Sequence, residues 1–120
     1  MIALVDDDDT VLEAIASLLR SLGYTVRTFR SGGAFLDWTD LSKTSCLVAD
    51  VMMPEIDGYE LQRRLATRGF HFPVIFLTAI TDAPARMRLL ESGAHSVLAK
   101  PCSQQSLIDC IESAIEHRSQ

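Results

Sequence analysis

Acidic residues directly follow two of the short apolar runs in this sequence. Asp6 and Asp7 come after the run at residues 2–5, and Asp50 comes after the run at residues 46–49. Carboxylate oxygens suit a hard divalent cation such as Mg²⁺ or Mn²⁺, which also attracts phosphate oxygens. An aspartate beside such a cation can act as the nucleophile that accepts a phosphoryl group. If the three carboxylates share one pocket, the pattern therefore predicts metal-dependent phosphoryl transfer.

Two further polar residues end apolar runs later in the chain. Thr78 follows the run at 74–77 and offers a hydroxyl donor, and Lys100 follows the run at 96–99 and offers a compact positive charge. In phosphoryl transfer the protein mostly positions groups and neutralises charge. Thr78 and Lys100 are therefore the predicted partners of the phosphoryl oxygens.

Bringing these residues together requires a fold in which several strand ends meet. Five short apolar or β-branched runs alternate with segments of helical spacing. The alternation predicts an α/β fold in which a parallel five-stranded sheet is covered by helices on both faces. With the strand order 2-1-3-4-5, the first and third strands are neighbours, which places the three aspartates together at the carboxyl edge. The predicted strands are residues 2–5, 25–29, 46–49, 74–77 and 96–99.

The first and third helices carry clear start and end signals. Asp8 and Asp9 favour the positive N-terminal end of the first helix, and Gly23 fits its C-terminal end. Asp57 and Glu60 have the spacing of a capping box at the start of the third helix. The predicted core stripe of the first helix is Val11, Ile15, Leu18 and Leu22, widened by Leu12 and Leu19.

The other helices are marked in a similar way. The second is predicted at residues 31–37. Asp82 is the predicted cap of the fourth, which has Pro84 in its first turn and ends before Gly93. Ser103 is the predicted cap of the fifth. The apolar stripe of the fifth helix is Leu107, Ile108, Ile111 and Ile115.

Length and composition restrict the class of protein. The 120 residues predict a single domain at 1–120 with no output domain in this chain, and 48% hydrophobic residues can build a core. A net charge of −5 disfavours direct nucleic-acid binding, and no apolar run approaches a membrane span. Without a signal-peptide pattern, the predicted location is cytoplasmic. The three cysteines and three histidines lack metal-ligand or disulfide spacing.

Four segments together resemble the receiver domain of two-component response regulators over essentially the whole chain. They are LVDDD at 4–8, VADVMMP at 48–54 with Gly58 following, FLTA at 76–79, and KP at 100–101. Any one of them alone would be a weak match, but their order and spacing are specific. The resemblance implies a flavodoxin-like (βα)5 three-layer sandwich. It also implies a signalling switch, not an enzyme, which takes part only in its own phosphorylation and dephosphorylation.

The resemblance assigns roles to the matching residues. Asp50 corresponds to the phosphoacceptor, Thr78 to the hydroxyl that moves toward the phosphoryl group, and Lys100 to the lysine that pairs with it. In the family the bond between this lysine and Pro101 is cis.

The resemblance also implies a magnesium site. Asp7 corresponds to a direct metal ligand, and Asp6 to an acid that reaches the metal mainly through water. The backbone carbonyl of Met52 corresponds to the group that completes the site together with Asp50.

The implied phosphodonor is a phosphohistidine on a sensor histidine kinase or a phosphotransfer protein. The implied output surface is formed by the fourth helix, the fifth strand and the fifth helix, and it would control homodimerisation or an output domain. Residues 29–36 and 60–64 are most similar to the subgroup with a helix-turn-helix DNA-binding output, which implies transcription regulation. The alternative is a stand-alone single-domain regulator or phosphorelay intermediate that acts through protein contacts.

Val97 departs from the family pattern. Many receivers carry Phe or Tyr three residues before the lysine, and this aromatic changes rotamer as the threonine moves. A β-branched valine is short and stiff at χ1. The aromatic half of the usual switch is therefore predicted to be absent or altered.

Three other functions remain open from the sequence. An FMN binder of the same fold would need a phosphate loop rich in Ser, Thr or Gly after the first strand, where this chain has acids. An aspartyl-phosphate hydrolase could use Asp6 and Asp8, but 120 residues leave little room for a substrate cap. A pseudo-receiver would bind a partner without taking phosphate.

Overall fold

The computed structural model describes residues 1–79 and 83–118, and within them five strands form one parallel sheet. The strand order is β2-β1-β3-β4-β5, which confirms the prediction. β3 and β4 each run one residue further than predicted, because Asp50 and Thr78 still pair with their neighbours. The strands are β1 (Ile2–Val5), β2 (Val26–Phe29), β3 (Cys46–Asp50), β4 (Val74–Thr78) and β5 (Ser96–Ala99).

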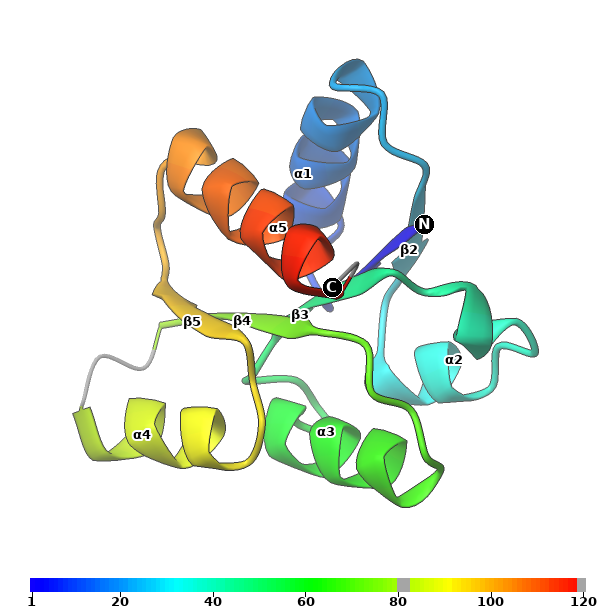
Figure 1. Cartoon of the computed structure of the whole chain (residues 1–120), viewed down its shortest axis with the longest axis vertical. Helices are drawn as coiled ribbons and strands as arrows, with labels where there is room; N and C mark the ends of the chain where they lie inside the picture. The colour runs from blue at the N-terminus through cyan, green and yellow to red at the C-terminus, as the bar shows by residue number, and fades with distance from the viewer. Residues whose placement is uncertain (80–82, 119–120) are drawn as a thin grey trace.

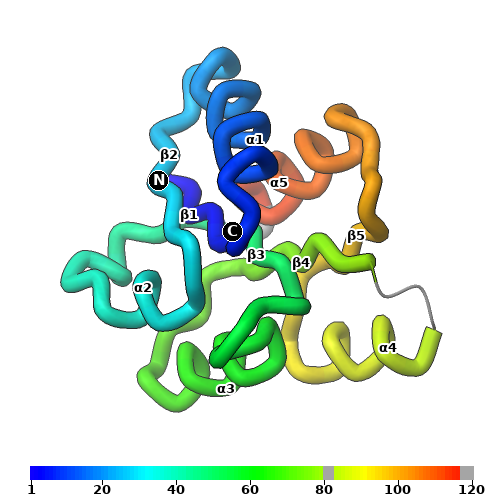
Figure 2. The backbone as a smooth tube through the Cα atoms, turned by 180° about the vertical axis from the view of Figure 1, so that it is seen from behind, coloured from blue at the N-terminus to red at the C-terminus, as the bar shows by residue number. Residues whose placement is uncertain are grey.

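Helices cover both faces of the sheet, as predicted for a three-layer sandwich. α1 (Asp9–Ser21) and α5 (Gln104–Arg118) lie on one face (Figure 1). α2 (Gly32–Leu36), α3 (Gly58–Thr67) and α4 (Ala83–Glu91) lie on the other, and the same two layers are visible from behind (Figure 2). A short 3-10 helix, Leu41–Lys43, was not predicted.

Each face of the sheet has its own apolar core, because successive strand residues point to opposite faces. In β1, Ile2 and Leu4 pack with α1 and α5, whereas Ala3 and Val5 pack with α2, α3 and α4. Strands buried on both sides in this way must be continuously apolar, which is the pattern that the sequence shows. Helices therefore pack on both faces of the sheet, and this packing fixes the position of the residues at its carboxyl edge.

Side-chain caps begin the helices at the predicted positions. Asp8 accepts hydrogen bonds from two backbone N–H groups of α1, and Asp57 accepts one from the N–H of Glu60. The Ser103 hydroxyl likewise accepts from the N–H of Ser106 at α5. The predicted cap Asp82 lies outside the described residues. A capping box also requires the Glu60 carboxylate to accept from the backbone N–H of Asp57. This part of the prediction is wrong, because the Glu60 carboxylate pairs instead with Arg63 and Arg64 of its own helix.

The predicted core stripe of α1 is displaced by one position. Its fully buried residues are Leu12, Ala16 and Leu19, whereas Leu22 is half exposed. The small Ala16 side chain lets the helix approach the sheet closely on this face. The other predicted stripe residues are only partly buried, and they line a groove described below.

Glu55 has a φ of +67°, a left-handed conformation that costs a residue with a side chain about 1–2 kcal/mol. Its side chain is exposed, so Glu55→Gly removes strain without removing packing. We expect this variant to raise the free energy of unfolding by about 0.5–1 kcal/mol, after the extra entropy of unfolded glycine is allowed for. Urea denaturation measures this value.

Glu13→Gly is the matched control, because Glu13 is exposed within α1. Glycine in a helix interior is expected to lower the same free energy by about 1 kcal/mol. A loss of stability in both variants would contradict the strain at Glu55.

Candidate functional site

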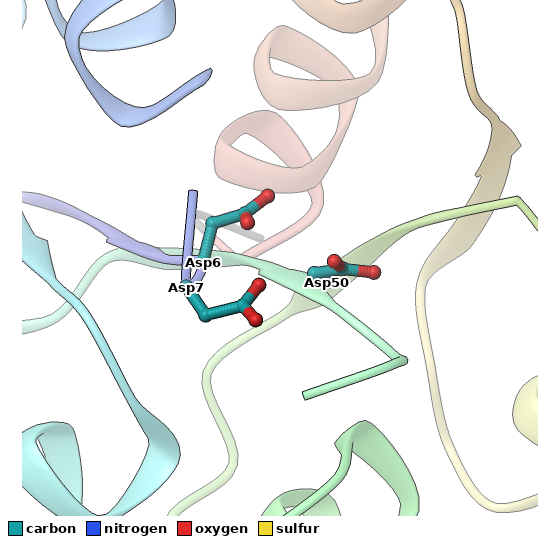
Figure 3. A group of neighbouring side chains, drawn as sticks. All are labelled: Asp6, Asp7 and Asp50. Atoms are coloured by element: carbon teal, nitrogen blue, oxygen red, sulfur yellow. The ribbon is translucent and has the colours of Figure 1, made fainter. Parts of the chain in front are cut away.

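Three carboxylates meet at the carboxyl edge of the sheet. One oxygen each from Asp6, Asp7 and Asp50 lies within 4.8 Å of the others (Figure 3). The sheet explains this, because β1 and β3 are paired neighbours, Val5 pairs with Ala49, and the acids follow directly. The predicted cluster is thus present in the structure.

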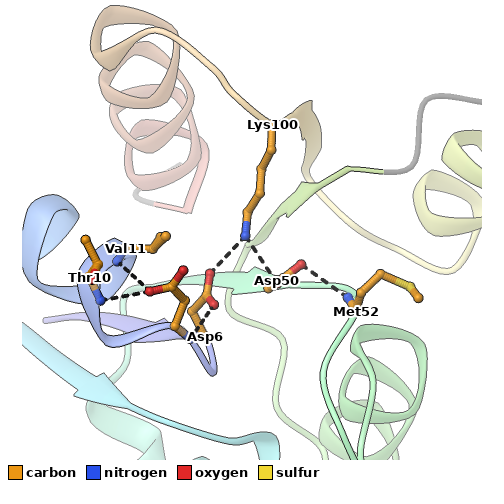
Figure 4. Close-up of polar contacts among 7 residues, drawn as sticks. Asp6, Thr10, Val11, Asp50, Met52 and Lys100 are labelled. Carbon is orange, nitrogen blue, oxygen red and sulfur yellow. Dashed lines mark hydrogen bonds and ion pairs between the residues drawn. The ribbon is translucent and has the colours of Figure 1, made fainter.

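Lys100 joins two of these carboxylates. Its Nζ lies 3.0 Å from Asp6 Oδ2 and 3.2 Å from Asp50 Oδ2 (Figure 4). The peptide bond that follows, Lys100–Pro101, is cis, as the family resemblance implied. The lysine therefore crosses the site from the end of β5 and ties the ends of β1 and β3 together.

Backbone N–H groups hold the other oxygen of each buried acid. The N–H of Asp8 donates to Asp6 Oδ1 at 2.9 Å, and the N–H of Met52 donates to Asp50 Oδ1 at 3.2 Å. Both are local turns in which an aspartate accepts from the residue two positions on. Sequence reasoning missed these two donors, although an aspartate at a strand end is a signal for such a turn. Asp6 and Asp50 are thus fixed at both oxygens.

Asp7, Met52 and Thr78 differ in their exposure. Asp7 is exposed, and no hydrogen bond of its carboxylate is found within residues 1–79 and 83–118. The side chain of Met52 is 62% exposed beside Asp50, and Thr78 is buried at the end of β4. Asp7 is therefore the acid most available to an incoming cation.

Burial and charge act in opposite directions on Asp50 and Lys100. Desolvation raises the pKa of Asp50 above its ordinary value, although the hydrogen bond and the charge of Lys100 act to lower it. Partial burial acts to lower the pKa of Lys100, but the hydrogen bonds and charges of Asp6 and Asp50 outweigh it and raise that pKa. The charged form of Asp50 is thus unfavourable at this site, and a further positive charge nearby would stabilise it.

The donor set fits a hard divalent cation. All three clustered ligands are carboxylate oxygens, without the sulfur or imidazole donors of a zinc site. Three carboxylates and the ammonium of Lys100 leave two negative charges, which a divalent ion would balance. The cluster could therefore bind a metal ion such as Mg²⁺.

A groove of about 400 Å³ opens beside Lys100, between α1 and the start of α5. Its walls are mostly apolar, and they include the residues of α1 that were predicted to face the core. The groove explains why these residues are only partly buried. The residues that line it include Val11, Ile15, Leu18, Pro101, Cys102 and Leu107.

The Lys100→Met variant tests the charge balance of the metal-free site. The pKa of Lys100 is raised on folding, so its stabilising contribution is fully present below the ordinary value of 10.5 and is lost as the pH rises through the folded pKa. With EDTA at pH 7, we expect the variant to lose about 2 kcal/mol of unfolding free energy, since two buried acids lose their shared counterion. Urea denaturation at several pH values measures the loss.

The loss should shrink toward pH 4. The pKa of Asp50 is already raised above 3.8, and removal of the ammonium raises it further, so the acid takes up a proton as the pH falls. Lys43→Met is the matched control, because the Lys43–Asp40 pair is exposed, and we expect little change. A loss that is the same at pH 4 and pH 7 would contradict this charge balance.

None of the helices in the described part of the chain is long and apolar enough to cross a membrane.

Comparison with known proteins agrees with this site. The family model described as the response regulator receiver domain matches residues 2–112. The response regulator protein TmoT of Ectopseudomonas mendocina is 39% identical over 97% of this chain and 53% of its own length. The transcriptional regulatory protein TdiR of Thauera aromatica is 41% identical over 92% of this chain and 49% of its own length. The chain thus spans about half the length of these curated relatives.

Solved structures give the same family. The response regulator StyR has a TM-score of 0.90 at 37% identity, covering 98% of this chain and 60% of the StyR chain. The structure titled FixJ-N has a TM-score of 0.88 at 32% identity, covering 97% of this chain and 93% of that one. The sequence match, the sheet order of this chain and the acids at the carboxyl edge of its sheet all point to the same family. The chain belongs to the family of response regulator receiver domains.

Proposed function

We propose that residues 1–120 form a phosphorylation-dependent signalling switch whose phosphoacceptor is Asp50. The observation that carries this proposal is the position of Asp50, a buried carboxylate at a strand end. It is bridged by Lys100 to Asp6 and is clustered with Asp7. The domain acts as a switch and not as an enzyme with a separate substrate.

In the proposed reaction, a carboxylate oxygen of Asp50 forms a bond to phosphorus as the P–N bond of a phosphohistidine breaks. The electron pair of that bond returns to the imidazole of the donor. Lys100 neutralises charge on the phosphoryl oxygens, and the Thr78 hydroxyl donates a hydrogen bond to them in the phosphorylated state.

Asp6, Asp7, Asp50 and the backbone carbonyl of Met52 would hold the metal, Mg²⁺ or Mn²⁺. When bound, the ion would balance the negative charge of the acids and of the phosphoryl group. The carboxylate of Asp7 is exposed and has no hydrogen bond within residues 1–79 and 83–118, which supports its role as a direct ligand.

The phosphodonor in this proposal is a sensor histidine kinase or a phosphotransfer protein. The apolar groove beside Lys100 supports a docking position for the donor, because it opens next to the lysine that contacts Asp50. A donor helix with an apolar face fits such a groove, and would bring its phosphohistidine to the carboxyl edge of the sheet.

The proposed output is control of homodimerisation or of an attached domain through the surface formed by α4, β5 and α5. The name of TdiR states that it is a transcriptional regulatory protein, which supports transcription regulation as the output. A net charge of −5 supports an indirect role, in which this chain itself does not contact nucleic acid. A stand-alone regulator or phosphorelay intermediate is the second candidate.

Labelling with acetyl phosphate tests the proposal. Wild-type protein with Mg²⁺ should gain the mass of one phosphoryl group, and peptide mapping should locate it at Asp50. Chelation with EDTA should prevent the gain. Labelling that is equal with and without the metal, or that maps to another residue, would contradict the proposal.

A further inference from the structure

Helices α3 and α4 lie side by side on one face of the sheet (Figures 1 and 2), and polar side chains join them. Gln62 Nε2 of α3 donates to the carbonyl oxygen of Ser92 at 2.6 Å and to its hydroxyl at 2.7 Å. Ser92 directly follows α4. Nearer the carboxyl edge, the Arg88 guanidinium lies 5.9 Å from the ring centroid of Tyr59. We call the contact between Gln62 and Ser92 the latch.

The latch leaves one polar atom of Gln62 without a protein partner among the described residues. Gln62 is only 7% exposed, and its Oε1 has no hydrogen-bond partner in the described part of the chain. The amide cannot simply be reversed, because the Ser92 carbonyl only accepts and therefore requires the Nε2 donor. A buried acceptor without a partner is unfavourable. The latched arrangement is thus less stable than its two hydrogen bonds alone would make it.

A hollow of about 160 Å³ lies beside the latch. Gln62 and Ser92 form part of its lining, with apolar walls that include Leu65, Phe70 and Phe72. The space is large enough for water. If Ser92 moves away, water in this space can bond both polar atoms of the amide. Water can thus replace the hydrogen bonds that the amide loses when the latch opens, so the released arrangement also satisfies the amide, as a two-state element requires.

Besides the latch and the Arg88–Tyr59 contact, helix α4 is attached through a small set of side chains in the described part of the chain. Ala85 and Leu89 are its buried residues, and Arg86 Nη2 donates to the carbonyl of Val97 in β5 at 3.1 Å. With so small an apolar contact, polar bonds carry a large share of the attachment. Loss of the latch would therefore loosen the C-terminal end of α4 in particular.

The chain connects the latch to the site at the opposite edge of the sheet. α3 begins after the loop that leaves Asp50, and the N–H of Gly58 donates to the carbonyl of Val51 at 2.8 Å. α4 follows β4, which ends at Thr78. A shift at the end of β3 can thus be passed to α3, one of the two helices that the latch joins.

We infer that the Gln62–Ser92 latch holds α4 against α3 in the unphosphorylated domain and is released when Asp50 carries a phosphoryl group. The inference rests on the proposed function, which supplies the trigger. Gln62 and Ser92 are positioning residues. The strength of their contact sets how much of the free energy gained at Asp50 is needed to release α4.

Hydrogen exchange of the α4 amides measures the latch without any phosphodonor. Gln62→Leu removes both hydrogen bonds and should speed exchange in α4 about tenfold, whereas Ser92→Ala keeps the bond to the carbonyl and should have a smaller effect. Because Gln62→Leu also removes the unsatisfied oxygen, its midpoint of urea unfolding should be unchanged or higher. Gln105→Leu, on the exposed surface of α5, is the matched control and should leave α4 unchanged. Equal α4 exchange in wild type and Gln62→Leu would overturn the inference.

Binding of beryllofluoride, which mimics a phosphoryl group on a carboxylate, measures the link to the site. Wild-type protein must break the latch on binding, so Gln62→Leu should bind about three to ten times more tightly in the presence of Mg²⁺. α4 exchange should then become the same in wild type and variant. Equal affinities would overturn the regulatory role. Failure of wild type to bind at all would instead count against the proposed function, and the exchange experiment would still report on the latch itself.

Discussion

The Asp50→Ala variant is expected to take up no phosphoryl group under conditions that label the wild type fully. Alanine has no oxygen that can bond to phosphorus, so the loss should be about 100-fold or more, whatever the metal concentration. The measurement is the fraction of protein that gains the mass of one phosphoryl group from acetyl phosphate with Mg²⁺. Equal labelling of variant and wild type would show that Asp50 is not the acceptor.

Two controls separate loss of the acceptor from loss of the fold or of the metal. Desolvation raises the pKa of Asp50, so its charge is unfavourable in the folded state and Asp50→Ala should remain folded in urea denaturation. Lys100 retains its contact with Asp6 in this variant. Asp7→Asn keeps the acceptor but weakens the metal site, so it should label more slowly, require more Mg²⁺ and still carry the label on Asp50. If Asp7→Asn takes up no phosphoryl group even at saturating Mg²⁺, Asp7 does more than bind the metal, which would contradict the roles proposed for Asp7 and Asp50.

The carboxyl edge of the sheet is readable in the sequence because each strand is a continuous apolar run that stops at a polar residue. Strand order then places Asp6 and Asp50 side by side, and the structure confirms both the order and the cluster. Caps such as Asp8 and Ser103 are equally predictable, since they act on the next few residues. The role of Lys100 as a bridge between two acids is not predictable, because it depends on three strand ends at once.

Features that depend on packing were harder to predict. Both Val11 and Leu12 begin apolar rows along α1, and periodicity alone cannot decide which row faces the sheet. In the structure, the row that faces the sheet is Leu12, Ala16 and Leu19, and the small Ala16 side chain suits a helix that lies close to the sheet. Gln62 carries no sequence signal for burial, since its partner Ser92 is thirty positions away.

Gly58 begins α3 at a point where no side chain fits. A Cβ there would lie 2.8 Å from Phe76 Cε1 and 2.9 Å from the backbone Cα of Val51. Its φ lies outside the left-handed region, so space and not backbone conformation requires glycine at this position. Val51 directly follows Asp50, the proposed acceptor, so a displacement of Val51 would also displace the site.

We expect Gly58→Ala to lower the free energy of unfolding by about 2 kcal/mol, since the buried overlap involves backbone and an aromatic ring of the core. Displacement of Val51 should also slow acetyl phosphate labelling of Asp50. Gly33→Ala is the matched control, because a Cβ at Gly33 meets nothing closer than 3.9 Å. That variant should be neutral or gain about 0.5 kcal/mol, as alanine favours a helix over glycine, and should label normally. Urea denaturation and labelling rates measure both effects, and equal stability of the two variants would show that α3 can shift to accept the extra methyl group.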